Sequence, residues 1–217
     1  MNPIFPTTKT EQHQIAGPAG NIEIITAWPQ QTAQPYIAII CHPHPLHLGT
    51  LHNKVVTTLH QAHFKLNIPT IRFNFRGVGK SEGQHDHGQG EQDDLKAVIH
   101  WAEKALPKHQ LLLSGFSFGS YIAAAVANQH NCQSLISIAP PTHHQDFSQL
   151  DQITAPWLMV ASKQDEVVPY ESFLKIEAQC TPAHEVITFD QCSHFFHGKL
   201  ILLREQCQQW LKKMLNI

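Results

Sequence analysis

The sequence has little net charge and no long apolar run, and both absences limit what the protein can bind. Its 217 residues include 17 acidic and 15 basic ones, which leaves a formal net charge of −2 at pH 7. So small a charge gives no electrostatic reason to expect nucleic acid or anionic lipid as a partner. No apolar run approaches the ~18 residues of a membrane-spanning helix, so no membrane partner is expected either.

The chain also lacks the marks of a secreted protein. Its start, MNPIFPTTKTEQHQ, has no basic segment followed by an apolar one, so no signal peptide is expected. The five cysteines are odd in number, widely scattered and without a C-x-x-C pair. Reduced thiols are the simplest interpretation, and we therefore expect a cytoplasmic protein.

Internal repeats and long linkers are missing as well. With 217 residues, 42% of them apolar, the chain is expected to form a single domain over residues 1–217. Short apolar runs alternate with longer helical patterns, which predicts an α/β fold with a mostly parallel sheet of about seven or eight strands and helices on both faces. The later runs are continuous rather than alternating, as in strands buried on both faces.

The predicted strands and helices direct the search for functional residues. The expected strands occupy residues 21–28, 36–41, 70–75, 110–114, 134–139, 156–161 and 184–189. The expected helices occupy residues 51–66, 90–105, 118–129, 170–179 and 198–215. The stretch AGPAGNIEI at 16–24 combines turn residues with an alternating strand and predicts an antiparallel hairpin at an edge of the sheet. Ligands bind beyond the carboxyl ends of the strands in such sheets, so the search begins where each strand ends.

Two G-x-S-x-G patterns compete for the role of a serine nucleophile, GKSEG at 79–83 and GFSFG at 115–119. GFSFG directly follows an apolar strand and directly precedes an alanine-rich helix, which is the strand–serine–helix order of a nucleophile elbow. GKSEG is followed by a polar loop instead, and a P-loop is excluded because position 74 is Asn rather than Gly. Ser117 is therefore the predicted nucleophile, and Ser81 is expected to be a structural turn residue.

The chain resembles the α/β-hydrolases from about residue 40 to 203, and within them the small bacterial branch that has no lid domain. The matching stretches, in the family's order, are CHPHPLHLGTLHNKVV, TIRFNFRGVGKSEG, GEQDDLKAVIHWAE, LLLSGFSFGSYIAAA, SIAPP, VASKQDEVVP and CSHFFHGKL. The resemblance implies the α/β-hydrolase fold without a cap and a serine hydrolase activity. RFNFRGVGKSEG is similar to the family's structural turn D-x-R-G-x-G-x-S, with Asn74 where many members have Asp.

The catalytic residues of this fold follow one another as serine, acid and histidine. Asp165 stands just after the strand PWLMVA, where the acid is expected, and Glu166 and Asp190 are its rivals. His194 lies in the loop before the last helix and is the expected base, whereas His197 is expected to cap that helix or pack in the core. A serine hydroxyl needs such a base at neutral pH, and the carboxylate holds the imidazole in the correct tautomer.

An oxyanion hole requires two backbone N–H donors. The first is expected from Phe118, directly after the nucleophile, and the second from the loop after the strand YIAIIC. The prolines of that loop, CHPHPLH, have no N–H, which leaves His44, Leu46 and His47. Similarity to the family's H-G-x-P loop favours His44, with Leu46 as the alternative.

Seventeen histidines raise the question of a metal site. Several stand close together in the sequence, in CHPHPLH (41–47), HDH (85–87), HH (143–144) and SHFFH (193–197). Zinc sites also need carboxylate or thiolate partners at defined spacing, and none is visible beside these histidines. We therefore expect no metal and no other cofactor. The simpler role for the side chains of His42 and His44 is packing against the turn near Arg76.

The spacing of the later strands indicates an open site. Between Pro141 and the strand that begins near Pro156 there is room for a short helix and nothing more, and an open site offers little apolar wall to a long acyl chain. The leading hypothesis is a serine hydrolase that cleaves a carboxylic ester of a small molecule through an acyl-enzyme. The ester is expected either to have a short acyl group or to be exposed. The alternatives are a peptidase, a thioesterase or an acyltransferase on the same triad, and a catalytically silent binding protein. The sequence names neither the substrate nor the oligomeric state.

Overall fold

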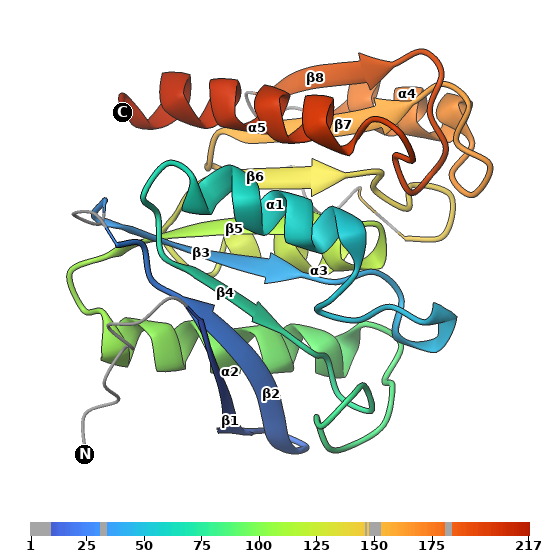
Figure 1. The fold of residues 1–217 in the computed structure, drawn as a ribbon. Helices are drawn as coiled ribbons and strands as arrows, with labels where there is room; N and C mark the ends of the chain where they lie inside the picture. The colour runs from blue at the N-terminus through green and yellow to red at the C-terminus, as the bar shows by residue number, and fades with distance from the viewer. Residues whose placement is uncertain (1–9, 31–33, 146, 148–152, 181–183) are drawn as a thin grey trace.

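One eight-stranded sheet forms the centre of the protein (Figure 1). The structure, a computed structural model, describes residues 10–30, 34–145, 147, 153–180 and 184–217. Its strands are β1 (Glu11–Gly17), β2 (Gly20–Ala27), β3 (Tyr36–Cys41), β4 (Thr70–Phe73), β5 (Gln110–Phe116), β6 (Cys132–Ile138), β7 (Trp157–Ser162) and β8 (His184–Phe189). Its helices are η1 (Pro45–His47), a short 3-10 helix, and α1 (Lys54–Phe64), α2 (Gln89–Ala105), α3 (Phe118–Ala127), α4 (Tyr170–Gln179) and α5 (Leu200–Leu215).

The strands lie in the order β1-β2-β4-β3-β5-β6-β7-β8. The pairs β1–β2 and β2–β4 are antiparallel, and every other pair is parallel. The predicted mostly parallel sheet is therefore confirmed, and the hairpin expected from AGPAGNIEI is β1–β2 at one edge. Because the parallel strands run in one direction, their carboxyl ends meet at one side of the molecule, on the right in Figure 1.

All expected strands and helices are present, with ends that differ by a few residues for local reasons. The helix expected from residue 51 begins at Lys54, because the Asn53 side chain accepts the Val55 N–H at 2.8 Å and caps the first turn. The strand expected to reach residue 75 ends at Phe73. Beyond it, the Phe75 N–H donates to Nε2 of His42 at 3.0 Å rather than to a neighbouring strand.

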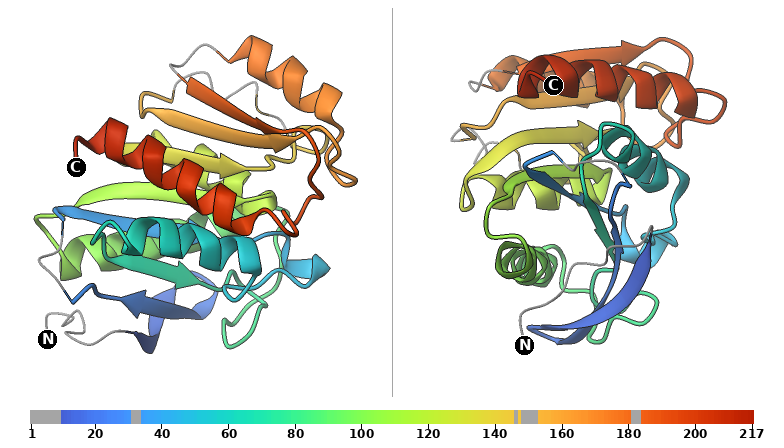
Figure 2. Two further views of the ribbon diagram at one scale, coloured as in Figure 1. Left: turned by 45° about the horizontal axis from the view of Figure 1, so that its top comes forward. Right: turned by 60° about the vertical axis from the view of Figure 1, so that its left-hand side comes forward.

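Helices cover both faces of the sheet, as Figure 2 shows. Helices α2, α3 and α4 pack on one face and α1 and α5 on the other, and each face has its own apolar core. Side chains of β3 alternate between these cores, with Ile39 in one and Ile40 in the other, and both are fully buried. Neither face of such a strand contacts solvent, so neither needs polar side chains, which explains the continuous apolar runs of the sequence.

A buried polar network holds the turn that follows β4. Ser81 Oγ donates to the Asn74 carbonyl at 2.6 Å and accepts the Glu23 N–H at 2.9 Å. The Glu23 carboxylate in turn accepts from Asn74 Nδ2 at 2.7 Å. An aspartate at position 74 would have no proton to donate to Glu23 and would bring two carboxylates together, so Asn74 is the residue that this partner requires. Ser81 thus stabilises this turn through its two hydrogen bonds.

The segment between β6 and β7 is only partly described. The expectation that it holds at most a short helix falls largely on residues 146 and 148–152, which lie outside the described residues. Within the described part of the chain, no helix is long and apolar enough to cross a membrane.

Replacing Ser81 by alanine should destabilise the protein without removing its chemistry. The change leaves the buried Glu23 N–H without its acceptor, so the free energy of unfolding should fall by about 1–3 kcal/mol. Urea unfolding measures that loss, and labelling by a fluorophosphonate probe should persist. If the Ser81→Ala protein lost labelling while keeping its fold, Ser81 would be the nucleophile after all.

Candidate active site

Ser117 is the single residue between the end of β5 and the start of α3. Its φ of 50° and ψ of −123° lie in a region that residues other than glycine rarely occupy. Three hydrogen bonds hold it there: its own N–H donates to the Ile138 carbonyl at 2.8 Å, and the N–H and Oγ of Ser120 donate to its carbonyl at 2.8 and 2.6 Å. The strand–serine–helix arrangement predicted for GFSFG is present.

The two glycines that flank Ser117 make this sharp turn possible. A Cβ atom on Gly115 would overlap the carbonyl group of Gly119, and one on Gly119 would overlap the carbonyl oxygens of Cys41 and His42. Only glycine lets the start of α3 approach β5 and the end of β3 so closely.

Asp165 and His194 form a buried pair in the loops that follow β7 and β8. His194 Nδ1 donates to Asp165 Oδ2 at 2.8 Å, and the two side chains are only 4% and 2% exposed. The other oxygen of Asp165 accepts the N–H groups of Val167 at 2.8 Å and Val168 at 2.7 Å. With Nδ1 bound to the carboxylate, Nε2 is the nitrogen that remains for chemistry.

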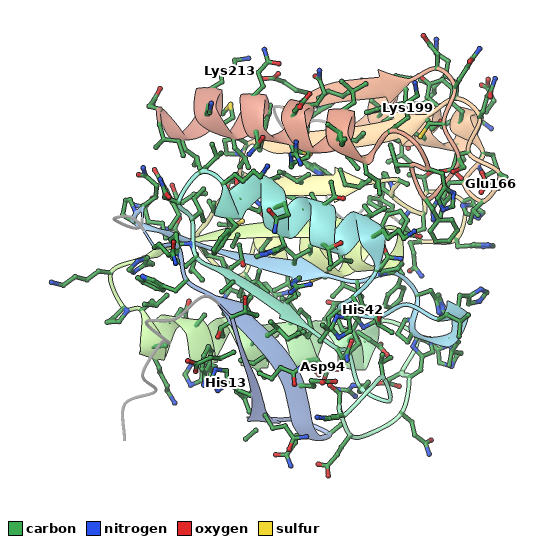
Figure 3. The ribbon with its side chains drawn as sticks, viewed as in Figure 1. His13, His42, Asp94, Glu166, Lys199 and Lys213 are labelled. Carbon is green, nitrogen blue, oxygen red and sulfur yellow. The ribbon has the colours of Figure 1, made fainter. Side chains whose placement is uncertain are left out.

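The rival carboxylates have other partners. Glu166 accepts the backbone N–H of His194 at 3.0 Å, so it fixes the loop rather than the imidazole ring. Asp190 is 78% exposed and pairs with Lys163 at 2.6 Å. Figure 3 shows Glu166 at the side of the molecule toward which the parallel strands point, where the ends of β7 and β8 meet. The geometry therefore brings Asp165 to His194, and neither rival takes its place.

The environment of Asp165 keeps its carboxylate ionised. Burial, the largest influence, disfavours the charge, but the hydrogen bonds from His194, Val168 and Val167 together outweigh it and lower the pKa of Asp165 below its usual value. An ionised Asp165 holds His194 in the tautomer that carries its proton on Nδ1.

Ser117 and His194 line one cavity of about 340 Å³. Its wall also includes His44, Phe118, His143 and Phe195. In the described residues no hydrogen bond joins Ser117 Oγ to the His194 ring. Such bonds are often long in a free enzyme and tighten only when substrate is bound.

Two backbone N–H groups at this cavity are available to a ligand. Phe118 is the first residue of α3, so its N–H has no partner within the helix. In the loop after β3, Leu46 donates its N–H to Nδ1 of His44 at 3.2 Å, and His47 donates to the His44 carbonyl at 3.1 Å. Among the described residues the His44 N–H makes no hydrogen bond. Of the three candidates left by the sequence, His44 is thus the one whose donor is unused.

Comparisons with known proteins agree with this geometry. A family model described as the alpha/beta hydrolase fold matches residues 61–152. The structure of an alpha-beta serine hydrolase homologue from Coxiella burnetii is 46% identical, with a TM-score of 0.91 over 94% of this chain and 98% of that one. The chain belongs to the α/β-hydrolase family. A member from Xanthomonas campestris, XC6422, described as an a/b serine hydrolase without lid, is 40% identical, with a TM-score of 0.88 over 98% of this chain and 97% of that one.

A further relative comes from a third organism. The uncharacterized protein RP471 of Rickettsia prowazekii is 33% identical in an alignment of 193 positions, which covers 84% of this chain and 81% of that protein. The predicted membership of the lidless branch of the α/β-hydrolases is therefore confirmed. The protein is a hydrolase.

The clustered histidines of this hydrolase have several separate roles. Both ring nitrogens of the fully buried His42 are used, since Nδ1 donates to the Pro43 carbonyl at 2.6 Å and Nε2 accepts the Phe75 N–H. Its ring also packs edge-on against the Phe75 ring, with the ring centres 4.7 Å apart, as expected for a residue that packs against the turn near Arg76. The described residues contain no group of three or more His, Cys, Asp or Glu side chains that could hold a metal ion.

One expectation for the hydrolase is wrong, and one residue at its cavity went unassigned. His197 neither caps α5 nor packs in the core, because α5 begins three residues later and the exposed His197 ring contacts Ser193 Oγ at 3.2 Å. His143 lines the cavity, although the sequence suggested no role for it. The available signal was its position, a few residues beyond the end of β6.

Asp165→Asn should make the stability of the hydrolase less dependent on pH. The folded-state pKa of Asp165 is lowered, so its charge stabilises the fold above the ordinary value of ~3.9, and this contribution is lost as the pH falls through the lowered pKa. Asn keeps the shape and loses the charge. In urea unfolding the free energy of unfolding of the variant should be lower than that of the wild type at pH 7. This difference should shrink below about pH 4.

The matched control is Asp190→Asn, because Asp190 lies on the surface in an exposed ion pair. Its effect at pH 7 should be small, since exposed pairs contribute little. A difference between Asp165→Asn and wild type that stayed constant from pH 7 to pH 3 would contradict the stabilising role assigned to the Asp165 charge.

Proposed function

We propose that this hydrolase cleaves carboxylic esters of small molecules with Ser117 as nucleophile, His194 as general base and Asp165 as the acid that orients it. One observation carries the proposal. A serine held in strained backbone geometry at a helix start shares a cavity with a histidine whose far nitrogen is bound to a buried carboxylate. This combination is what a serine hydroxyl needs in order to attack a carbonyl at neutral pH.

In the proposed reaction, Ser117 Oγ attacks the ester carbonyl while Nε2 of His194 takes the hydroxyl proton. The tetrahedral intermediate then collapses, the bond to the alcohol oxygen breaks, and His194 returns the proton to the departing alcohol. An acyl group remains on Ser117. Water, deprotonated by the same imidazole, attacks this acyl-enzyme and releases the acid. No cofactor takes part in these steps.

The N–H groups of Phe118 and His44 are the proposed oxyanion donors. Both are unused in the described structure, and that of Phe118 stands at the positive end of α3. Donors of this kind stabilise the negative oxygen of the intermediate by ~3 kcal/mol each. Leu46, the alternative donor, is less suitable because its N–H already donates to the His44 side chain.

The size and openness of the site support a short acyl group or an exposed ester. A cavity of about 340 Å³ is near the lower end of the range for ligand pockets, ~300–1,000 Å³. Two of its apolar wall residues, Val167 and Phe195, are 45% and 39% exposed, so they provide a rim rather than an enclosed tunnel.

Ser117→Ala should abolish both hydrolysis and covalent labelling. Without the hydroxyl no acyl-enzyme forms, and loss of such a nucleophile reduces kcat by roughly 10⁵-fold or more. The assay is turnover of p-nitrophenyl butyrate, together with labelling by a fluorophosphonate probe and circular dichroism to verify folding. Parallel assays with thioester and peptide substrates rank the reaction types. If the wild type fails to react with the probe, the protein is a silent binding protein and the proposal is wrong.

Longer acyl chains should increase kcat/KM only up to a few carbons. Each buried CH₂ contributes ~0.8 kcal/mol, but only while an apolar wall covers it. In a series from p-nitrophenyl acetate to palmitate, kcat/KM should rise over the first few carbons and then flatten or fall. No jump should occur at the critical micelle concentration, because a protein without a lid has none to open. A continued rise to the C16 chain would reveal an acyl tunnel instead.

A further inference from the structure

His143 contributes an imidazole to the cavity wall, and the proposed reaction gives it no task. It lies beyond the end of β6 in a tight turn, where the N–H groups of His144 and Gln145 both donate to the Pro141 carbonyl at 3.1 Å. The hydroxyls of Thr142 and Ser172 are 2.9 Å apart and join this turn to the start of α4. The His143 backbone is therefore held in place on both sides.

Among the described residues, the ring of His143 has no hydrogen-bond partner. Its Nδ1 atom is buried without one, and in the described residues no hydrogen bond uses Nε2 either. His44 and His194, which line the same cavity, differ in this respect, because their Nδ1 atoms bind Leu46 and Asp165. Buried polar atoms in folded proteins are nearly always paired, so a polar ring without a partner at a candidate active site points to a ligand.

The protonation state of His143 indicates which chemical group would suit it. Burial lowers the pKa of His143, the neighbouring His144 and His194 rings lower it further, and Asp165 only partly opposes them. The ring is therefore neutral at ordinary pH and offers one donor and one acceptor. A hydroxyl group, itself both donor and acceptor, complements either tautomer, whereas a carboxylate would gain no opposite charge.

The position of the turn indicates which part of an ester His143 would meet. His143 and His194 line the same cavity, and both Asp165 and His194 are near enough to influence the charge of the His143 ring. The departing alcohol must be within reach of His194, from which it receives its proton. The proposed oxyanion donors of Phe118 and His44 instead contact the carbonyl oxygen. A ring beside His194 would therefore meet the alcohol part of the ester.

We propose that His143 determines specificity by hydrogen bonding a hydroxyl group in the alcohol part of the ester. The substrates are then esters of polyhydroxy alcohols, such as monoacylated glycerol, rather than esters of simple alkyl alcohols. This inference rests on the ester hydrolysis proposed above and adds the class of leaving group to it.

The test compares two esters with the same carbon skeleton, glycerol 1-monobutyrate and propyl butyrate, by titration of the released acid. For the wild type, kcat/KM should be at least about fivefold higher for the glycerol ester, the scale of one hydrogen bond between neutral groups. His143→Phe should bring this ratio close to one. His143→Gln, whose amide can still donate and accept, should restore part of it.

His100→Phe is the control, because His100 is an exposed residue of α2 outside the cavity, and this variant should keep the wild-type ratio. The wild-type ratio needs no variant, so it tests the inference even if His143→Phe fails to fold. A wild-type ratio near one, or a preference that persists in folded His143→Phe, overturns the inference. So does a preference for butyrate esters that carry a hydroxyl on the acyl side instead.

Labelling of Ser117 by the fluorophosphonate probe separates this inference from the proposed function. A labelled wild type that hydrolyses both esters equally well disproves the role of His143 and leaves the ester hydrolysis standing. A folded wild type that is not labelled overturns the hydrolysis, and the inference with it.

Discussion

The candidate site depends on one close approach, that of the start of α3 to β5 and to the end of β3. Gly115 and Gly119 permit this approach, and Ser117 between them adopts a backbone conformation that costs about 1–3 kcal/mol. The cost is offset by burial, because α3 packs its apolar side chains against the middle strands of the sheet. The surrounding packing thus holds Ser117 in its strained conformation.

The other members of the proposed triad come from strands that lie nearer to one edge of the sheet. Asp165 and His194 follow β7 and β8, and β8 is the edge strand. Two hydrogen bonds join these loops. The His194 ring donates to Asp165, and the His194 backbone N–H donates to Glu166. Adjacent carboxylates therefore fix the ring and the chain of the same histidine, and an edge loop is held firmly enough to present Nε2 to the cavity.

The many histidines show how the environment of a side chain determines its role. His63 Nε2 and Ser114 Oγ are 2.9 Å apart in the core, where burial lowers the pKa of His63 to about 3. His42 supports the turn after β4, and burial lowers its pKa to about 4. Rings such as these act as neutral polar groups inside the protein. His143 differs from them in its place at the cavity, because among the described residues the Nδ1 atom of His63 is also buried without a partner.

The sequence by itself determined the order of strands and helices, the elbow around Ser117 and the positions of Asp165 and His194 after their strands, because periodicity, glycine spacing and strand ends are local properties. Only the tertiary structure decided that Glu23 requires Asn74 and that, among the described residues, the His44 N–H and the His143 ring have no hydrogen-bond partner. These properties depend on contacts between segments distant in the sequence, as with Asn74 and Glu23. The misjudged His197 has the same cause, since no local pattern showed where its ring would lie.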